Sequence, residues 1–323
     1  MKKKFLFLMA LLAVSLLALA EMTVYVYQKD GTKVEYLAAN VDSIGFVNVL
    51  TITFDANGGS GSMDVVRVKE GESITLPTNE FSNAKAEFAS WNTAANGSGT
   101  AYADKGTVKP TANITLYAQW EVPTTGTENG HEWVDLGLPS GTKWATMNVG
   151  ADSPEDYGDY FAWGETTTKS TYSWSTYKWC NGSSSSMTKY CVSSSYGTVD
   201  NKTTLDLSDD AAYVNWGSSW RMPTDEELNE LRTNCTWTWT TQNGVKGYKF
   251  TSKIYGNSIF LPAAGYCGNS GLGDAGSYGH YWSSSLDTDR SDYAYYWFLW
   301  SANVYSRRDR RYFGQSVRPV MAK

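Results

Sequence analysis

The sequence predicts an α+β fold in which β-strands predominate. Short runs of apolar and aromatic residues alternate with turns rich in glycine and serine, and only two segments have the spacing and capping residues of helices. With 323 residues, the chain has room for two or three domains. Only 19% of the residues are charged, and eight prolines without a long polar tract argue against extensive disorder, so compact modules are expected.

The first twenty residues have the pattern of an export signal. Lys2 to Lys4 provide a positive start, Phe5 to Leu17 an apolar core, and Ala18 to Ala20 a cleavage site of small residues. The apolar run is short for a bilayer crossing, and no basic flank follows it. We therefore expect an exported protein, secreted or held at the cell surface with the periplasm as the alternative, and no membrane span once the signal is removed.

The four cysteines and the net charge limit the chemistry. Export allows disulfides, and four cysteines permit three pairings, which the sequence leaves open; Cys180 and Cys191 flank a Gly/Ser loop and are the easiest to close, leaving Cys235 and Cys267. There is no CxxC pair and there are only two histidines, so we expect no metal and no cofactor. A net charge of −6 gives no reason to expect a nucleic-acid partner.

Residues 21–48 are predicted to form a leader hairpin. Apolar and aromatic residues alternate between Thr23 and Phe46, on both sides of Lys29-Asp30-Gly31. Asp-Gly between alternating runs is a strong hairpin signal, so we expect strand, turn and strand here.

Residues 49–121 form the first predicted module, with strands at Thr51–Phe54, Val65–Val68 and Ile114–Trp120. The glycine-rich loop at Asp55–Gly61 is followed by a strand and not by a helix that could aim amide groups at a phosphate, so we expect a turn. The ordered motifs TITFDANGG, EGESITLP, FASWNTAANGSGTAYADKGTV and ITLYAQW resemble the Listeria-Bacteroides repeat of internalin B type. That resemblance implies a compact β-grasp-like spacer or contact module of surface and secreted proteins.

A polar stretch of Pro, Thr and Gly at residues 122–130 is predicted to be a linker, and residues 131–323 one large domain. Two helices are expected in that domain. Ser208–Trp216 begins with a serine cap, and in Thr224–Cys235 the first residue forms a capping box with Glu227 while apolar residues fall on one face.

Five motifs of the large domain occur in order: VDLGLPSGTKWATMNVGA, WGSSWRMPTDEELNELRTNC, NSIFLPAAGY, GSYGHYWSSS and GQSVRPV. Together they resemble the Fibrobacter succinogenes major paralogous domain, which looks like the formylglycine-generating-enzyme branch of the C-type-lectin-like fold. The resemblance implies a compact domain with two helices, small twisted sheets and long loops around buried tryptophans such as Trp220 and Trp282. The enzyme branch uses a pair of reactive cysteines near its C-terminus, and no cysteine follows Cys267, so no enzymatic activity is expected.

The candidate binding surface lies between Tyr281 and Val320, where aromatic residues and arginines concentrate. Ala294–Trp300 consists of alanine, leucine and aromatic residues, and strand alternation places Tyr295, Trp297 and Leu299 inward and Tyr296, Phe298 and Trp300 outward. Tyr305–Phe313 is expected to be a loop closed by Gly314 and Val317. The alternative is a solvated loop after a wholly buried strand. The predicted ligand-binding residues are Asp289, Ser291, Asp292, Tyr293, Tyr296, Phe298, Trp300, Tyr305, Ser306, Arg307, Asp309, Tyr312 and Phe313.

Two other interpretations of this segment are weaker. Asp287, Asp289 and Asp292 lack the glycine turn that lets oxygen ligands converge on calcium, so they are expected to be solvated. The run Arg307–Arg311 could attract nucleic acid, but pairing between its own arginines and aspartate and the predicted export favour a solvated or ligand-contacting face.

The segment also resembles the variable region of proteins diversified by retroelements, in which asparagine codons of a C-terminal lectin-fold segment are randomised. That process cannot produce Trp300. The residues of types that it can produce are Tyr293, Tyr296, Phe298, Tyr305, Ser306, Arg307, Asp309, Tyr312 and Phe313.

The sequence therefore predicts a non-enzymatic, adhesin-like protein that binds a protein or glycan ligand outside the cell through this face. The alternative is a carbohydrate-binding module, in which the exposed rings stack on sugars. An oxidase of the formylglycine-generating type is the least favoured alternative. The ligand and the oligomeric state stay open at this point.

Overall fold

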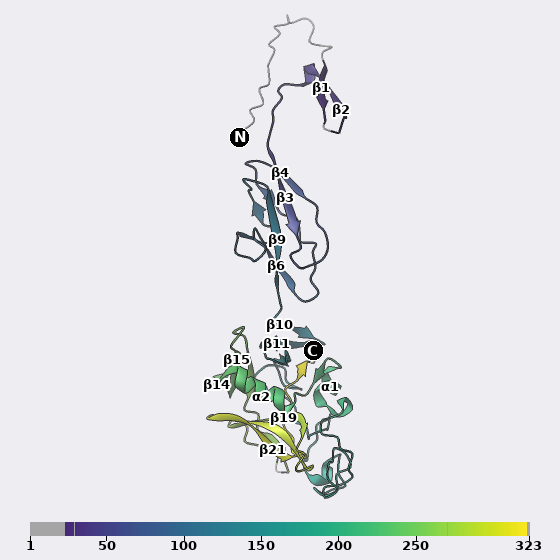
Figure 1. Ribbon diagram of the computed structural model, residues 1–323. Coiled ribbons are helices and arrows are strands. Elements are labelled where there is room, and N and C mark those ends of the chain that lie inside the picture. The colour runs from purple at the N-terminus through teal and green to yellow at the C-terminus, as the bar shows by residue number, and fades with distance from the viewer. Residues whose placement is uncertain (1–22, 29, 270, 322–323) are drawn as a thin grey trace, which may run out of the picture. The chain divides into compact units, whose positions relative to one another are not determined.

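A computed structural model describes residues 23–28, 30–269 and 271–321 (Figure 1). The predicted export signal at residues 1–20 lies outside the described residues. The chain divides into two compact units, with the boundary between Glu121 and Val122. Each unit has a hydrophobic core of its own, and we describe them separately.

The first unit begins with the predicted hairpin. Strands β1 (Thr23–Tyr27) and β2 (Lys33–Leu37) pair antiparallel as a two-stranded sheet, and a short 3-10 helix, η2 (Ala38–Asn40), follows. The strand, turn and strand expected from the alternating pattern are confirmed.

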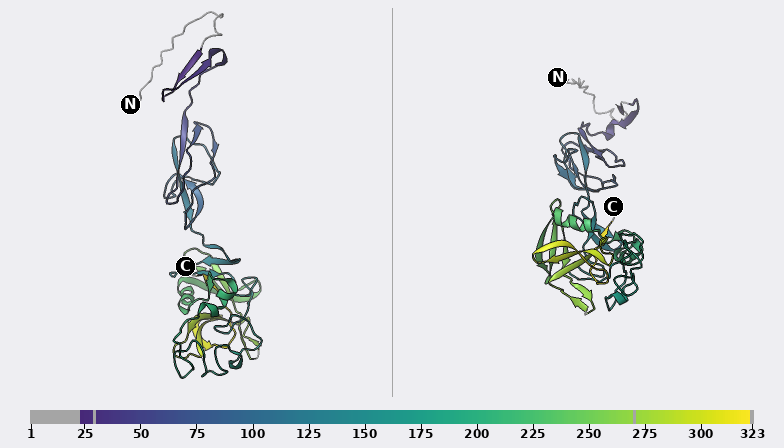
Figure 2. Two further views of the ribbon diagram at one scale, coloured as in Figure 1. Left: turned by 90° about the vertical axis from the view of Figure 1, so that its right-hand side faces the viewer. Right: turned by 60° about the horizontal axis from the view of Figure 1, so that its bottom comes forward.

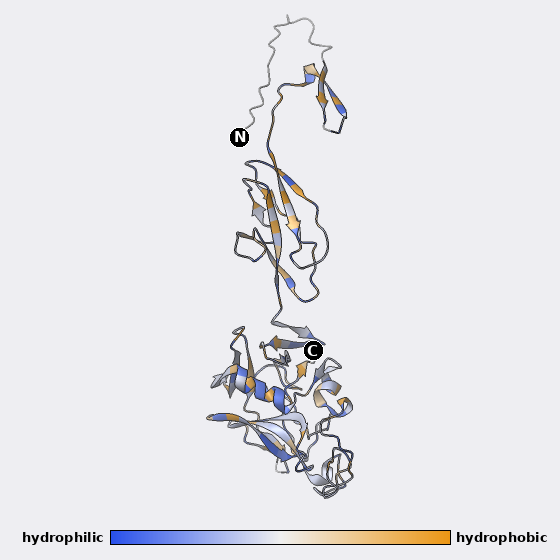
Figure 3. Cartoon of the chain, in the orientation of Figure 1, coloured by the Kyte–Doolittle hydropathy of each residue, from blue (hydrophilic) through white to orange (hydrophobic). Residues whose placement is uncertain are grey.

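The rest of the first unit is built on a five-stranded sheet. Its strand order is β4-β3-β9-β6-β7, and only the β3–β9 pair is parallel among the pairs that the structure describes here. Ile52, Trp91 and Leu116 are fully buried in its core. Orange and blue positions alternate along these strands in Figure 3, as expected for strands with one buried face. The strands are β3 (Val49–Asp55), β4 (Val66–Lys69), β6 (Glu87–Asn92), β7 (Ala101–Tyr102) and β9 (Ile114–Glu121), with β5 (Ile74–Thr75) and β8 (Thr107–Val108) as a separate pair.

The glycine-rich loop after β3 is a turn, as expected. Asn57 and Gly58 both have positive φ angles, which the turn requires. At Gly59 a Cβ atom would lie 2.5 Å from the Trp120 ring, so only glycine allows the indole to pack here. The Trp120 indole N–H donates to the Ala56 carbonyl at 2.9 Å, which fixes the loop to β9, the central strand of the sheet.

The second unit begins with a strand where a linker was expected. Residues Thr125–Glu128 form β10 and pair with β11 (His131–Asp135), so the linker prediction for residues 122–130 is wrong over this stretch. Gly126 pairs with Trp133, and the Trp133 ring packs directly over the glycine. The composition of residues 125–128 does not predict a strand, because β11 and not β10 provides the large apolar side chain, Trp133. Strands β10 and β11 belong to a five-stranded sheet of the second unit with the order β10-β11-β12-β22-β13. Its other strands are β12 (Lys143–Ala145), β13 (Trp220–Arg221) and β22 (Val320–Met321).

Both predicted helices of this unit are present. Helix α1 (Ala211–Trp216) begins later than expected, because the preceding residues form a 3-10 turn, η4 (Leu207–Asp209), and Asp210, not Ser208, accepts the capping hydrogen bonds. Helix α2 (Asp225–Asn234) has the predicted capping box of Thr224 and Glu227. Among the described residues, no helix is both long and apolar enough to cross a membrane.

Most of the remaining chain forms small antiparallel sheets. Between β12 and η4 the chain runs mainly through turns and single bridges, with one 3-10 helix, η3 (Trp174–Thr176). Strands β19, β20 and β21 form a curved three-stranded layer, drawn in yellow-green and yellow in Figure 2. The sheets are β14 (Cys235–Gln242), β15 (Val245–Ser252) and β16 (Ser258–Pro262); β17 (Tyr266–Gly268) and β18 (Gly271–Gly273); and β19 (Tyr278–Leu286), β20 (Tyr293–Trp300) and β21 (Asn303–Arg310).

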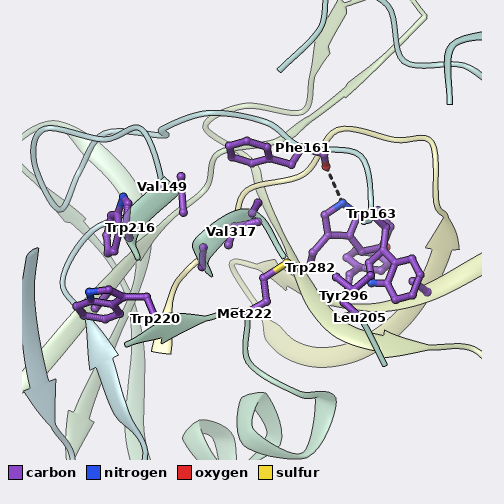
Figure 4. Close-up of a cluster of buried hydrophobic side chains, with 14 of the residues drawn as sticks. Val149, Phe161, Trp163, Leu205, Trp216, Trp220, Met222, Trp282, Tyr296 and Val317 are labelled. Atoms are coloured by element: carbon purple, nitrogen blue, oxygen red, sulfur yellow. Dashed lines mark hydrogen bonds between the residues drawn. The ribbon is translucent and has the colours of Figure 1, made fainter. Parts of the chain in front are cut away.

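Buried tryptophans hold the second unit together, as expected. Trp220 and Trp282 are both completely buried, and the Trp282 indole N–H donates to the Phe161 carbonyl at 2.9 Å (Figure 4). Trp163 and Tyr296 lie in the same cluster. A second cluster on the other side of the three-stranded sheet contains Trp297.

The four cysteines are free thiols. The pair Cys180 and Cys191, the easiest to close on sequence grounds, is therefore not bonded in the structure. Both thiols lie instead in or against a cluster of buried aromatic side chains, where they pack as small apolar groups.

Candidate ligand-binding site

The three-stranded sheet turns two different faces to its surroundings. In register, His280 on β19 is opposite Phe298 on β20, and Phe298 is opposite Tyr305 on β21. Because side chains alternate along each strand, these residues share one face, which we call the outer face. The opposite, inner face carries Trp297 and Leu299, which are buried in the core as predicted.

Burial of the outer face changes along β20. Ala294 is completely buried and Tyr296 is 5% exposed, whereas Phe298 is half-buried and Trp300 is 37% exposed. Figure 4 shows Tyr296 inside the buried cluster, where its ring centroid lies 6.0 Å from that of Trp282. The prediction that the aromatic residues of this face are all exposed is therefore wrong for Tyr296, because its ring belongs to the buried cluster that also contains Trp282 and Val317.

The open end of the outer face is concave. It encloses a volume of about 590 Å³, which lies within the usual size range of small-molecule sites. Strands β19, β20 and β21 provide most of its wall, and the segment around β17 and β18 closes one side. We call this concavity the hollow; its lining residues are Tyr266, Asp274, Tyr278, His280, Tyr296, Phe298, Trp300, Tyr305, Arg307, Asp309 and Phe313.

Aromatic rings in the hollow pack against one another and leave little freedom for rearrangement. Tyr278 stacks on Phe298 with ring centroids 5.2 Å apart, and Tyr305 meets Phe298 edge-on at 5.7 Å. The guanidinium carbon of Arg307 lies 4.8 Å from the Phe298 ring centroid and 5.0 Å from that of Tyr305. Cation–π contacts of this kind hold the guanidinium in place without consuming its hydrogen-bond donors.

Arg307 differs from Arg308 and Arg290 in its charge partners. Arg308 forms ion pairs with Asp287 at 3.1 Å and Asp289 at 3.3 Å, and Arg290 pairs with Asp292. Within the described part of the chain, Arg307 has no ion pair. It is also exposed, so its guanidinium is available to a ligand.

His280 lies at the floor of the hollow. It is only 5% exposed, and neither ring nitrogen has a hydrogen-bond partner among the residues described by the structure. Its ring is nearly parallel to that of Tyr296, at 5.2 Å between centroids. Burial, reinforced by the charge of Arg307, lowers the pKa of His280 to about 4. The imidazole is therefore neutral at pH 7 and offers one donor and one acceptor.

Asp309 is the acidic group deepest in the hollow. It accepts hydrogen bonds from the Arg310 backbone N–H at 2.8 Å and from the Gln315 side-chain amide at 3.1 Å. Burial raises the pKa of Asp309 to about 6, and these contacts and nearby arginines oppose the shift only in part.

The predicted ligand-binding residues separate into two groups. Phe298, Trp300, Tyr305, Arg307, Asp309 and Phe313 line the hollow together with the buried Tyr296. Ser306 points away from it and donates a hydrogen bond to Asp225 on α2. Asp289 pairs with Arg308 outside the hollow. Tyr293 lies beneath the guanidinium of Arg290, at 4.1 Å from carbon to ring centroid.

Three of the predicted residues are in the interior, which corrects their placement on the surface. Ser291 is completely buried, and Asp292 and Tyr312 are nearly so. The Ser291 carbonyl accepts a hydrogen bond from Arg311 at 2.8 Å, and the Tyr312 ring packs edge-on against Trp174 at 4.8 Å. These side chains support the fold and cannot reach a ligand without rearrangement.

The expected loop at Tyr305–Phe313 is mainly a strand. β21 continues to Arg310, and Arg311 is completely buried. The Arg311 guanidinium donates to the Tyr177 hydroxyl at 2.8 Å and to the carbonyls of Lys189, Tyr190 and Ser291, so carbonyl oxygens and a hydroxyl satisfy a charge that the sequence suggested was solvated.

Four residues of the hollow were not predicted from the sequence: Tyr266, Asp274, Tyr278 and His280. Tyr278, His280 and Trp282 alternate along β19 with the period of a strand, and that pattern could have placed them on one face. Asp274 and Tyr266 had no such signal, since only the packing of β17 and β18 brings them to the wall.

A second depression of about 620 Å³ adjoins the hollow and shares Tyr296, Tyr305, Arg307 and Asp309 with it. Half of the remaining lining residues are charged groups that are already paired: Asp287 with Arg308, and Arg290 with Asp292. Within the ranges that the structure covers, no group of three His, Cys, Asp or Glu side chains is arranged to hold a metal ion.

Comparison with known proteins identifies one part of the chain. Residues 51–119 match the family model of the Listeria-Bacteroides repeat domain. No curated protein and no solved structure matches the chain. The C-terminal domain, which carries the hollow, has no family assignment. The repeat is a bacterial surface-protein domain, and it indicates a surface protein. The first unit of this chain therefore contains a Listeria-Bacteroides repeat domain at residues 51–119.

Proposed function

We propose that this is an exported, adhesin-like protein, surface-displayed or secreted, that binds a protein or glycan ligand through the hollow of its second unit. The repeat domain supports a place at the bacterial surface. The observation that carries the proposal is the combination of exposed Trp300 and Arg307 with Tyr305 on a rigid sheet, around a concavity of ligand size. Trp, Tyr and Arg dominate binding hot spots because they offer large contact areas and directional hydrogen bonds.

The proposed activity is binding and not catalysis. His280 is the one neutral base in the hollow, and it stacks on Tyr296 without a carboxylate to orient it among the described residues. A general base that activates a nucleophile usually depends on such an orienting partner.

We further propose that the second unit is a C-type-lectin-like domain of the Fibrobacter succinogenes major paralogous type. The five sequence motifs support this assignment, as do two helices, several small sheets and a core of buried tryptophans. An experimental structure that superimposes on a C-type-lectin-like domain over the full unit would establish it, and one with a different strand connectivity would refute it.

The retroelement hypothesis concerns how the surface could vary. Phe298, Tyr305, Arg307 and Asp309 have residue types that such diversification produces, and they line the hollow. Buried Tyr312 has the same codon property but lies in the core. A near-copy of the 281–320 coding segment beside a reverse transcriptase gene would support diversification, and a genome without either would refute it.

The test of binding uses a triple variant, Trp300→Ala with Tyr305→Ala and Arg307→Ala. Wild type and variant are applied as labelled probes to an array of extracellular proteins and to a glycan array. We expect the wild type to bind and the variant to lose that binding, with nearly unchanged melting temperature, because these side chains contribute little to the core.

A matched control carries Tyr255→Ala and Arg232→Ala, which remove an exposed tyrosine and an exposed arginine of the same unit outside the hollow. This control should bind as the wild type does. Equal binding by wild type and triple variant would refute the proposed site.

A further inference from the structure

We infer that the hollow binds an uncharged saccharide residue, with His280 as its hydrogen-bond partner at the floor. This inference rests on the proposed binding function and goes further by naming the chemical class of the ligand and a residue of the site. It follows from the unpartnered imidazole, the mixture of polar groups around it and the exposed rings at the rim.

The first step is the state of His280. A buried polar group without a partner destabilises a fold, so most buried polar groups are hydrogen-bonded. His280 lines the hollow with both ring nitrogens unpartnered among the described residues, although it is almost completely buried. Two hydroxyls of a ligand can satisfy the neutral ring, because one can accept from its N–H and another can donate to its other nitrogen.

The second step is the set of charges around that ring. Arg307 can only donate hydrogen bonds, whereas the carboxylate oxygens of Asp274 and Asp309 accept them. An anionic ligand would meet the two carboxylates, and a cationic ligand would meet the guanidinium of Arg307. A polyhydroxylated ring, whose every hydroxyl both donates and accepts, matches this mixture without a net charge.

The third step is the apolar wall. Trp300, at 37%, is the only tryptophan among the described residues that is exposed, and it lies at the rim beside Tyr278. The C–H faces of a pyranose can pack on such rings, while the concave shape suits one or two sugar residues better than the broad contact of a protein partner. A protein ligand is the competing outcome that the experiment must distinguish.

The experiment uses the full mature chain on a glycan array of neutral and acidic oligosaccharides, with the array of extracellular proteins in parallel. Saccharides that bind are then titrated by calorimetry against wild type, His280→Phe, His280→Gln and Trp300→Ala. We expect neutral saccharides to bind wild type, at least a tenfold loss of affinity for His280→Phe and Trp300→Ala, and a smaller loss for His280→Gln.

His280→Gln restores one donor and one acceptor, so it separates hydrogen bonding from shape. Tyr255→Ala serves as the control and should leave affinity unchanged. The melting temperature of His280→Phe should not fall, because the variant removes an unpartnered polar group, and this shows that lost affinity does not come from lost folding.

Several results would overturn the inference. Saccharide binding that is unaffected by His280→Phe and Trp300→Ala would place the sugar elsewhere, and binding confined to acidic glycans would contradict the charge argument. Binding to the protein array alone, lost in the triple variant, would refute the saccharide and retain the proposed function. Binding to neither array would refute both.

Discussion

His280 and Asp309 are two titratable groups of one hollow whose pKa values move in opposite directions. Burial lowers the pKa of His280 to about 4 and raises that of Asp309 to about 6, so burial favours the neutral form of each. The neighbouring charges and ionisable rings are those of Asp274, Arg307 and the tyrosines of the wall. The hollow therefore contains two buried ionisable side chains whose pKa values are shifted, and such groups are typical of functional sites.

The shift of His280 predicts a stability change with pH. Its pKa in the folded state lies below the ordinary value of 6.5, so between about pH 6.5 and pH 4 the unfolded chain takes up a proton that the folded chain does not. The contribution of His280 to the free energy of unfolding is therefore fully present above pH 6.5. It decreases by up to about 3 kcal/mol as the pH falls to about 4. Urea unfolding at pH 7 and pH 4.5 should show a smaller acid loss in His280→Phe than in wild type.

The second histidine provides the control for this measurement. His131 stacks on Trp216 at 3.7 Å between ring centroids and is less deeply buried, with a pKa lowered by burial. His131→Phe should reduce the acid loss less than His280→Phe does. Equal acid losses in wild type and His280→Phe would show that His280 is protonated freely in the folded chain.

At the scale of the element, strand β20 divides the outer face into a buried end and an open end that lines the hollow. Tyr296 and Trp300 are separated by only four positions, yet one is nearly buried and the other is exposed. Helix α2 supports the neighbouring strand, because Asp225 in its first turn accepts a hydrogen bond from Ser306 on β21. The rings of the hollow therefore lie on a sheet that α2 supports from its inner face.

This division predicts that replacing two tyrosines of the same face by alanine lowers the free energy of unfolding by different amounts. Tyr296→Ala should lower the free energy of unfolding by about 3 kcal/mol, because it removes a ring from the core. Tyr305→Ala should lower it by about 1 kcal/mol or less, since the ring is only half-buried at the wall of the hollow. Denaturant unfolding of both variants checks the difference, and similar losses would show that Tyr305 also belongs to the core.

Local sequence patterns predicted where the strands and helices lie better than they predicted which side chains are buried. Alternation along residues 294–300 predicted the two faces of β20, and the capping box at Thr224 predicted the start of α2. Neither pattern could show that the segment after β21 returns to the edge of β19, where Ser316 bridges Tyr281, since this contact depends on long-range packing. Arg311 illustrates the difficulty, because its sequence neighbours suggest a solvated charge while distant carbonyls bury it.

At the scale of the whole molecule, the chain has two separate cores. Ile52 and Trp91 belong to the core of the repeat domain, while Trp220 and Trp282 belong to that of the second unit. The domain boundary was predicted near the right place, but the linker was predicted to extend over β10, which belongs to the second unit. The proposed binding function resides in the second unit, and the repeat domain indicates a surface protein.

Separate cores predict independent folding. Residues 122–323 expressed without the first unit should keep their melting temperature and the binding of the full chain, because every residue of the hollow lies in that piece. Residues 49–121 should also melt cooperatively alone. Scanning calorimetry of the full chain and of both pieces provides the measurement, and loss of the folded second unit on removal of the first would contradict this account.

The most direct test of the binding site is hydrogen exchange of the full chain with and without the ligand that the arrays identify. Binding in the hollow should slow exchange in residues 278–280 and 293–310, on the strands that carry His280, Trp300 and Arg307. The repeat domain should exchange as before. Slower exchange in the repeat domain with no change in those three strands would contradict the assignment of the hollow as the ligand site.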